Sequence, residues 1–163
     1  MKIGILTSGG DCPGLNAVIR GAVLKGIAVH GHEFVGFLDG WRGVVEGDAM
    51  PLTRKDIQGI AKQGGTILGT SRTNPFEAGG GADVVKQNMA DLGVEALIAI
   101  GGAGTLSIAL RLAGHGIPVV GVPQTIDNDI DLPPDVDTFG FQTARHVGAE
   151  LVKNLMVDAF TTS

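Results

Sequence analysis

The 163-residue chain has no tyrosine, one tryptophan, one cysteine and no apolar run near the roughly 20 residues that span a bilayer. A single cysteine, Cys12, excludes an internal disulfide, so the sequence does not require an oxidising compartment. Met1-Lys2 leads into a short apolar run, which is not the pattern of a secretory signal peptide. We therefore expect a cytoplasmic protein that does not act at a membrane.

Positive charge is also scarce. The chain has 12 lysines and arginines against 17 aspartates and glutamates, a net charge of −5. This balance argues against a general nucleic-acid-binding protein. The chain also lacks both G-x-G-x-x-G and G-x-x-x-x-G-K-[ST]. These absences disfavour a Rossmann dehydrogenase and a P-loop NTPase.

Glycine is abundant, with 27 residues, in a chain that is 44% hydrophobic. The glycines separate apolar runs rather than replace them, which indicates an ordered globular protein rather than low-complexity sequence. A chain of 163 residues is long enough to bury one core. We expect residues 1–163 to form a single domain.

Short apolar runs alternate along the chain with segments of helical periodicity. The pattern predicts strands at residues 2–7, 33–38, 96–100 and 118–122, and a turn-rich segment at 39–43. It predicts helices beginning near residue 15 and at residues 54–62, 82–92, 106–113 and 141–156. This order predicts an α/β fold, a Rossmann-like three-layer sandwich with a mainly parallel sheet and helices on both faces.

Three of the expected strands end in glycine-rich or acidic loops, at residues 8–14, 101–105 and 123–129. Ligands of parallel sheets bind beyond the carboxyl ends of the strands, so these loops are candidates for one site. In "SGGDCPG" and "GGAGT", backbone amides at a helix start suit an anion, and Thr105 caps the helix or donates to phosphate. Taken alone, each is equally well explained as a tight turn or a simple helix cap.

Side chains that suit phosphoryl chemistry lie in two further segments. In "PQTIDND", one of Asp127 and Asp129 can accept a hydroxyl proton while the other orients it or holds a metal, with Thr125 beside them. In "GTSRTNPF", Arg72 can pair with phosphate through two hydrogen bonds. The alternatives are an Asx-rich turn and a solvated loop arginine.

Together these segments resemble the N-terminal half of the 6-phosphofructokinase family, in its bacterial branch of ATP- and pyrophosphate-dependent enzymes. Six motifs carry the resemblance in order: "KIGILTSGGDCPGLNAVIRG", "GFLDGWRG", "GGTILGTSR", "IAIGGAGT", "VPQTIDNDI" and "TFGFQTA". The resemblance implies transfer of a phosphoryl group from ATP or pyrophosphate to the 1-hydroxyl of fructose 6-phosphate in glycolysis. It also implies Mg²⁺ as cofactor, a homo-oligomer and allosteric control, with Lys25 and Arg54 as effector contacts or merely surface charges.

The resemblance assigns roles to individual residues. Asp127 would be the general base, Arg72 a transition-state clamp, and Thr125 and Asp129 would help hold the sugar and the transferring group. Asp127 and Asp129 would also hold the metal. The donor site would comprise Gly10, Arg72, Thr73, Gly102, Ala103, Gly104, Thr105 and Gln124.

Three departures from the family pattern bear on function. Family members usually carry an acidic residue, which engages magnesium, where this chain has Ala103. Gly104 is typical of ATP-using members, whereas pyrophosphate users have aspartate at 104 and lysine at 124. Gln124 fits neither pattern. We expect ATP, because a glycine at 104 leaves room for the nucleotide. The family's sugar-phosphate domain is absent from this sequence, so the alternative to an enzyme is a catalytically impaired nucleotide-binding or regulatory fragment.

Overall fold

The computed structural model describes residues 1–77, 79–133 and 138–162, which form one mixed sheet flanked by helices. The sheet order is β3-β2-β1-β4-β5-β6, and every neighbouring pair is parallel except β2 and β3. The expected α/β fold with a mainly parallel sheet is therefore confirmed. The strands are β1 (Lys2–Ser8), β2 (Glu33–Phe37), β3 (Ala49–Pro51), β4 (Ala96–Gly101), β5 (Val119–Thr125) and β6 (Phe139–Gly140).

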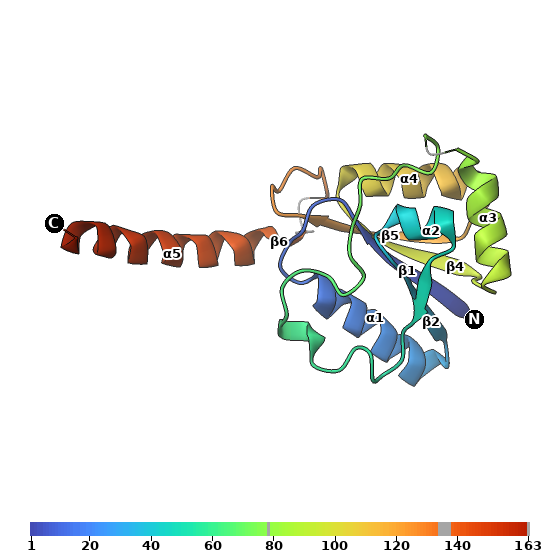
Figure 1. The fold of residues 1–163 in the computed structure, drawn as a ribbon, viewed down its shortest axis with the longest axis horizontal. Helices are drawn as coiled ribbons and strands as arrows, with labels where there is room; N and C mark the ends of the chain where they lie inside the picture. Colours follow the sequence, from blue (N-terminus) through green and yellow to red (C-terminus); the bar gives the residue numbers. More distant parts are fainter. Residues whose placement is uncertain (78, 134–137, 163) are drawn as a thin grey trace.

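Helices cover both faces of this sheet (Figure 1). On one face lie α1 (Leu15–His30) and the short 3₁₀ helix η1 (Ile60–Lys62); on the other lie α2 (Trp41–Glu46), α3 (Gly81–Asp91) and α4 (Ala103–Gly114). Alternate residues of a strand face opposite sides, so Ile5 packs in the core beneath α1 and Leu6 in the core beneath the other helices. The three-layer arrangement follows from these two cores.

The helix predicted at residues 54–62 is wrong. The structure has turns there, and only Ile60–Lys62 forms a 3₁₀ helix. Thr53 starts the segment like a helix cap, since its backbone N–H donates to the Asp56 carboxylate over 2.8 Å. Gly59 then adopts a left-handed conformation with φ of 79°, which breaks the helix.

Residues 41–43 differ from their prediction as turns, whereas residues 39 and 40 form a turn as predicted. Helix α2 begins at Trp41 and is followed by the short edge strand β3. The Trp41 and Val44 side chains are fully buried, so tertiary packing stabilises a six-residue helix that local glycines disfavour. Helix α4 begins at Ala103, three residues earlier than predicted, because the "GGAGT" loop supplies its first turn.

The final helix, α5 (Phe141–Thr161), extends away from the sheet beyond β6 (Figure 1). It is five residues longer than predicted, and none of its 21 residues is buried. Among the described residues, no helix has both the length and the apolar composition that crossing a bilayer needs. Helix α5 is thus the one helix of the described chain that lacks a packed face.

Candidate functional site

The three loops singled out from the sequence meet at one edge of the sheet. Strands β1, β4 and β5 are neighbours, and the register pairs Ser8 with Gly101 and Gly101 with Pro123. Because these strands are parallel, the loops that follow them lie side by side. The strand order reverses direction between β1 and β4, which is where doubly wound folds bind ligands.

Glycine allows the first two loops to touch. A Cβ built on Gly101 would collide with the Ser8 carbonyl oxygen and with Oγ1 of Thr105. The buried Thr105 hydroxyl donates to that same Ser8 carbonyl over 3.1 Å. The first turn of α4 is therefore held against the end of β1, with its free amides pointing along the helix axis toward the loops.

The segment after residue 65 is tied to the same edge by three hydrogen bonds. Hydroxyls of Thr7, Ser8 and Thr70 donate to the carbonyls of Gly69, Ser71 and Gly9, over 2.8, 3.1 and 2.7 Å respectively. These bonds span about sixty residues of sequence. They place Arg72, the next residue along, beside the turn that contains Gly9.

A cavity of about 420 Å³, here called the α4 cavity, separates this segment from α4. Four of the residues predicted for the donor site line it: Arg72, Thr73, Gly104 and Thr105. Apart from the neighbouring backbone of α4 itself, no atom lies within 4 Å of a Cβ built on Gly104, so this wall is open.

The α4 cavity also has lining residues that the sequence analysis missed, among them Ile108, Arg111 and Glu77. Ile108 and Arg111 lie four and seven residues after Gly104, which places all three on one face of α4. Counting helical turns from the "GGAGT" loop would have identified Ile108 and Arg111 from the sequence.

The far wall of the α4 cavity is fixed by an aromatic contact. The Arg111 guanidinium carbon lies 3.7 Å from the ring centroid of Phe76, and Phe76 also lies near the His115 ring. The Asn74 amide donates to the Glu77 carboxylate over 2.7 Å within the same turn. The segment carrying Arg72 is thus anchored at both ends.

A second, smaller cavity of about 100 Å³ contains the paired carboxylates and is called the acidic cavity. The Thr125 hydroxyl donates to Oδ1 of Asp129 over 2.6 Å and accepts the Asp127 backbone N–H over 3.0 Å. Asn128 makes the sharp turn between the two aspartates in a left-handed conformation, with φ of 54°. The lining residues are Gly10, Gly102, Ala103, Gln124, Thr125, Ile126, Asp127 and Asp129.

The two cavities are neighbours along the chain. Gly9 lines the α4 cavity and Gly10 the acidic one, while Ala103 lines the acidic cavity and Gly104 the other. All residues predicted for the site therefore line one cavity or the next. The guanidinium groups of Arg72 and Arg111 lie in the α4 cavity together with the carboxylate of Glu77, whereas Asp127 and Asp129 line the acidic cavity. The two guanidinium groups suit a phosphate chain, and the paired aspartates suit a neighbouring hydroxyl group.

Two carboxylates are few for a metal site made by protein alone. The described residues contain no cluster of three or more histidine, cysteine, aspartate or glutamate side chains placed to hold an ion. Mg²⁺ is often bound by one or two carboxylates together with substrate phosphates and water. Asp127 and Asp129 fit that mode, whereas Ala103 contributes no ligand.

Cys12 lies under the site but is not equipped for catalysis. It is 3% exposed, and its thiol packs against the carbonyl of Phe139. Burial raises the pKa of the Cys12 thiol, although a hydrogen bond to Gln124 partly opposes this. The thiol therefore stays neutral, and neutral thiols are poor nucleophiles.

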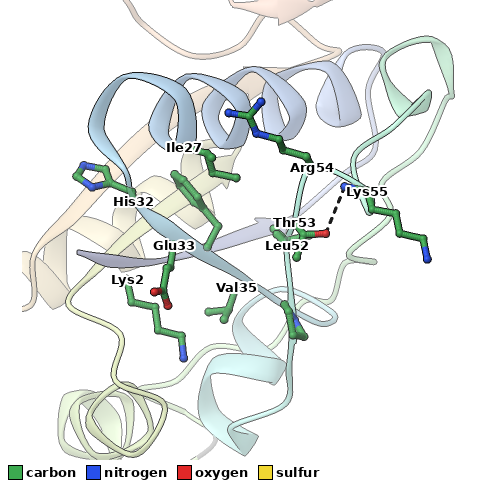
Figure 2. Close-up of a pocket in the computed structure, with 11 residues that line it drawn as sticks. Lys2, Ile27, His32, Glu33, Val35, Leu52, Thr53, Arg54 and Lys55 are labelled. Atoms are coloured by element: carbon green, nitrogen blue, oxygen red, sulfur yellow. Dashed lines mark hydrogen bonds between the residues drawn. The ribbon is translucent and has the colours of Figure 1, made fainter.

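A further hollow, of about 700 Å³, lies at the opposite edge of the sheet, near the start of β2 (Figure 2). Arg54 lines it, whereas Lys25, its companion in the effector prediction, does not. Figure 2 shows that Arg54 extends toward α1 while Lys55 points away. The cationic side chains therefore do not converge on one ligand position.

Comparisons with known proteins agree with this geometry. A family model described as phosphofructokinase matches residues 2–163. The chain is 55% identical over 159 residues to a pyrophosphate–fructose 6-phosphate 1-phosphotransferase of Amycolatopsis mediterranei, covering 98% of this chain and 46% of that protein. It is 50% identical over 159 residues to ATP-dependent 6-phosphofructokinase 3 of Streptomyces coelicolor, with the same coverage.

A solved structure of phosphofructokinase from Saccharomyces cerevisiae superposes with a TM-score of 0.81 at 28% identity. The superposition covers 97% of this chain and 24% of that one. The chain spans about half the length of the curated relatives it matches.

Proposed function

Since the chain belongs to the phosphofructokinase family, we propose that it supplies the donor site and general base for phosphoryl transfer from ATP to the 1-hydroxyl of fructose 6-phosphate. One observation carries this proposal. The hydrogen-bonded Thr125, Asp127 and Asp129 turn lines one cavity with Gly10 and Gly102, and Arg72 lines the neighbouring cavity with Gly9 and Gly104. Three parallel strands thus bring the proposed proton acceptor near the proposed anion site.

In the proposed reaction, Asp127 accepts the proton of the sugar hydroxyl as that oxygen bonds to the transferring phosphorus. The bond from this phosphorus to the bridging oxygen of ATP breaks in the same step, and ADP leaves. Thr125 orients the turn, because its hydroxyl is engaged by both the Asp127 amide and the Asp129 carboxylate. Arg72 and the first amides of α4 offset charge on the phosphate oxygens. This chemistry depends mostly on positioning and charge neutralisation.

Mg²⁺ is the cofactor we propose, held by Asp127 and Asp129 together with the donor phosphates. When bound, it neutralises charge on the phosphates. Because Ala103 replaces the acidic residue usual in the family, the chain's own contribution is limited to two carboxylates and the backbone amides.

The donor is proposed to be ATP because the α4 cavity continues past Arg72 and the open Gly104 wall to Ile108 and Arg111. Gly104 and Arg111 are seven residues apart on α4, about 10 Å along the helix axis, which supports a donor that is longer than pyrophosphate. Pyrophosphate is the second candidate, since the relatives matched at 55% identity carry the pyrophosphate-dependent name. The names of the matched relatives give no support to an impaired nucleotide-binding fragment.

Two measurements test the proposal. Calorimetry on the 163-residue chain with Mg²⁺ should detect ATP binding that is lost on Arg72→Ala. For turnover, the chain is fused to the part of the Amycolatopsis mediterranei relative that its match leaves uncovered, and fructose 1,6-bisphosphate is measured by a coupled assay with ATP and with pyrophosphate.

Asp127→Ser in this fusion should reduce turnover by a factor on the order of 10² to 10⁴, the usual contribution of a general base. Donor affinity should change little, because the sugar hydroxyl is absent from that measurement. Unchanged turnover in Asp127→Ser would refute the role of the base. Turnover with pyrophosphate alone would refute ATP as donor while leaving the rest intact.

A further inference from the structure

Helix α1 contains a buried asparagine in its first turn. Asn16 is the second residue of α1 and is 1% exposed, and no other asparagine among the residues that the structure describes is buried. Asparagine is seldom buried unless partners take up its hydrogen-bonding groups, because an unpaired amide in the core is destabilising. The partners of Asn16 therefore indicate what this side chain does.

Asn16 binds three backbone groups of one distant segment. Its amide nitrogen donates to the carbonyl oxygen of Gln63 over 3.2 Å and to that of Gly64 over 3.4 Å. Its Oδ1 accepts the backbone N–H of Ile67 over 2.9 Å. Both ends of the amide are thus engaged by residues 63–67, which lie 47 to 51 residues later in the sequence.

The segment at residues 63–71 needs such partners because it forms no helix or strand of its own. Backbone groups of an irregular segment must pair with side chains or with water. Asn16 supplies partners at its start, and the hydroxyls of Thr7 and Ser8 supply them at its end. The segment runs from η1, beside α1, to the neighbourhood of α4, and Arg72 follows it directly (Figure 1).

The same asparagine is joined to the glycine loop of the site through α1. This helix begins at Leu15, directly after the "SGGDCPG" loop, whose Gly9 and Gly10 line the two cavities. The hydrogen bonds of Asn16 therefore connect that loop to the segment that carries Arg72. Asn16 itself lines neither cavity, so it can affect a ligand only through the residues that it positions.

We infer that Asn16 is a positioning residue of the donor site: its amide fixes residues 63–67 against α1 and thereby sets where Arg72 lies in the α4 cavity. This inference rests on the proposed function, in which Arg72 pairs with the donor phosphates. A guanidinium forms two parallel hydrogen bonds with phosphate only in a narrow range of orientations. A shift of the main chain at Ile67 therefore reaches the ligand through Arg72, and misplacement by about 1 Å can be costly.

Calorimetry of ATP binding to the 163-residue chain with Mg²⁺ tests the inference. Asn16→Ala should weaken ATP binding about tenfold, because the segment loses three hydrogen bonds and Arg72 its fixed position. Asn16→Asp should lose as much, since a carboxylate has the size of the amide but cannot donate to the two carbonyl oxygens that face it. Wild-type affinity in Asn16→Asp would mean that the side chain only fills space, and the inference would be wrong.

Asn88→Ala is the matched control. The Asn88 amide also donates to two consecutive carbonyls, those of Val44 and Val45, over 2.9 and 2.6 Å, but it lies on α3 and lines neither cavity. Its removal should leave the affinity for ATP within about twofold of the wild type. Trp41 fluorescence shows that each variant is folded during the titration. An equal loss of affinity in Asn88→Ala and Asn16→Ala would contradict a specific role for Asn16.

The route through Arg72 is tested with a double-mutant cycle. Arg72→Lys keeps the positive charge but replaces the rigid guanidinium fork with a flexible ammonium group. On this background Asn16→Ala should weaken ATP binding by less than about threefold, because the orientation of the fork has already been lost. The same tenfold loss on both backgrounds would show that Asn16 does not act through Arg72.

Amide hydrogen exchange of the wild-type chain without ligand keeps the test decisive if Asn16→Ala does not fold. The Ile67 N–H should be protected at least about a hundredfold more than that of Gly64, for which the structure describes no acceptor. An unprotected Ile67 amide would overturn the inference. A wild-type chain that binds neither ATP nor pyrophosphate would instead refute the proposed function, whereas unchanged ATP affinity in Asn16→Ala would refute the positioning role alone.

Discussion

Two glycines of the "GGAGT" loop are expected to respond in opposite directions to the same substitution. A Cβ on Gly101 would collide with the Ser8 carbonyl and Oγ1 of Thr105 and would lie 2.7 Å from the Thr105 Cβ. At Gly104, three residues later, no atom outside the neighbouring backbone of α4 lies within 4 Å of the added Cβ. The pair therefore tests whether the ends of β1 and β4 and the first turn of α4 touch as described.

Gly101→Ala should lower the free energy of unfolding by about 2 kcal/mol, within the usual range of 1 to 3 for overpacking. The collision involves backbone, so no rotamer change relieves it. For a chain of this size that corresponds to a fall in melting temperature of about 4 to 8 °C. Gly104→Ala should be neutral or raise stability by up to about 1 kcal/mol, because alanine favours the helix.

The assay is urea unfolding followed by the fluorescence of Trp41. This single tryptophan is fully buried, so its emission reports loss of the core. The urea concentration at the midpoint of unfolding should fall in Gly101→Ala, while the slope of the free energy of unfolding against urea concentration stays constant. If Gly101→Ala matches the wild type within about 0.5 kcal/mol, the ordinary scatter of surface substitutions, the two loops do not make the described contact.

Three further changes test the site. Thr125→Val should lower turnover of the fused enzyme at least about tenfold, because valine cannot donate the hydrogen bond to the Asp129 carboxylate. Thr125→Ser keeps the hydroxyl and should restore turnover, so an equal loss in both variants would contradict this role. Arg111 forms the far wall of the α4 cavity, so Arg111→Ala should weaken ATP binding more than pyrophosphate binding in calorimetry. An equal change in both affinities would contradict the placement of the nucleotide in this cavity. Because burial raises the pKa of Cys12, the folded state holds that proton at higher pH than the unfolded chain, so stability should be full below about pH 8 and fall above it. Cys12→Ala should flatten the fall seen in urea unfolding at pH 7 to 10, and an unchanged slope would contradict the assignment.

The sequence by itself determined four of the six strands, the order of the longer helices and the loops at the site, but it missed α2, β3 and β6. Apolar runs ending in glycine predicted β1 and β4, and helical spacing predicted α1, α3 and α4, because these signals are local. The same locality explains the failures. Thr53 and Asp56 look like a helix start in sequence, but packing of the following segment against α1 and the turn at Gly59 prevent the helix.

Only the tertiary structure decided which segments meet. Ser8 and Gly101 are far apart in sequence and became neighbours because β1 and β4 pair in parallel. Helix α2 depends on burial of Trp41, which no local pattern reveals. The candidate residues of the site were named from the resemblance of their motifs to a known family, because the residue types alone fit turns and helix caps equally well. The α4 cavity depends on packing between distant elements, which only the folded chain contains.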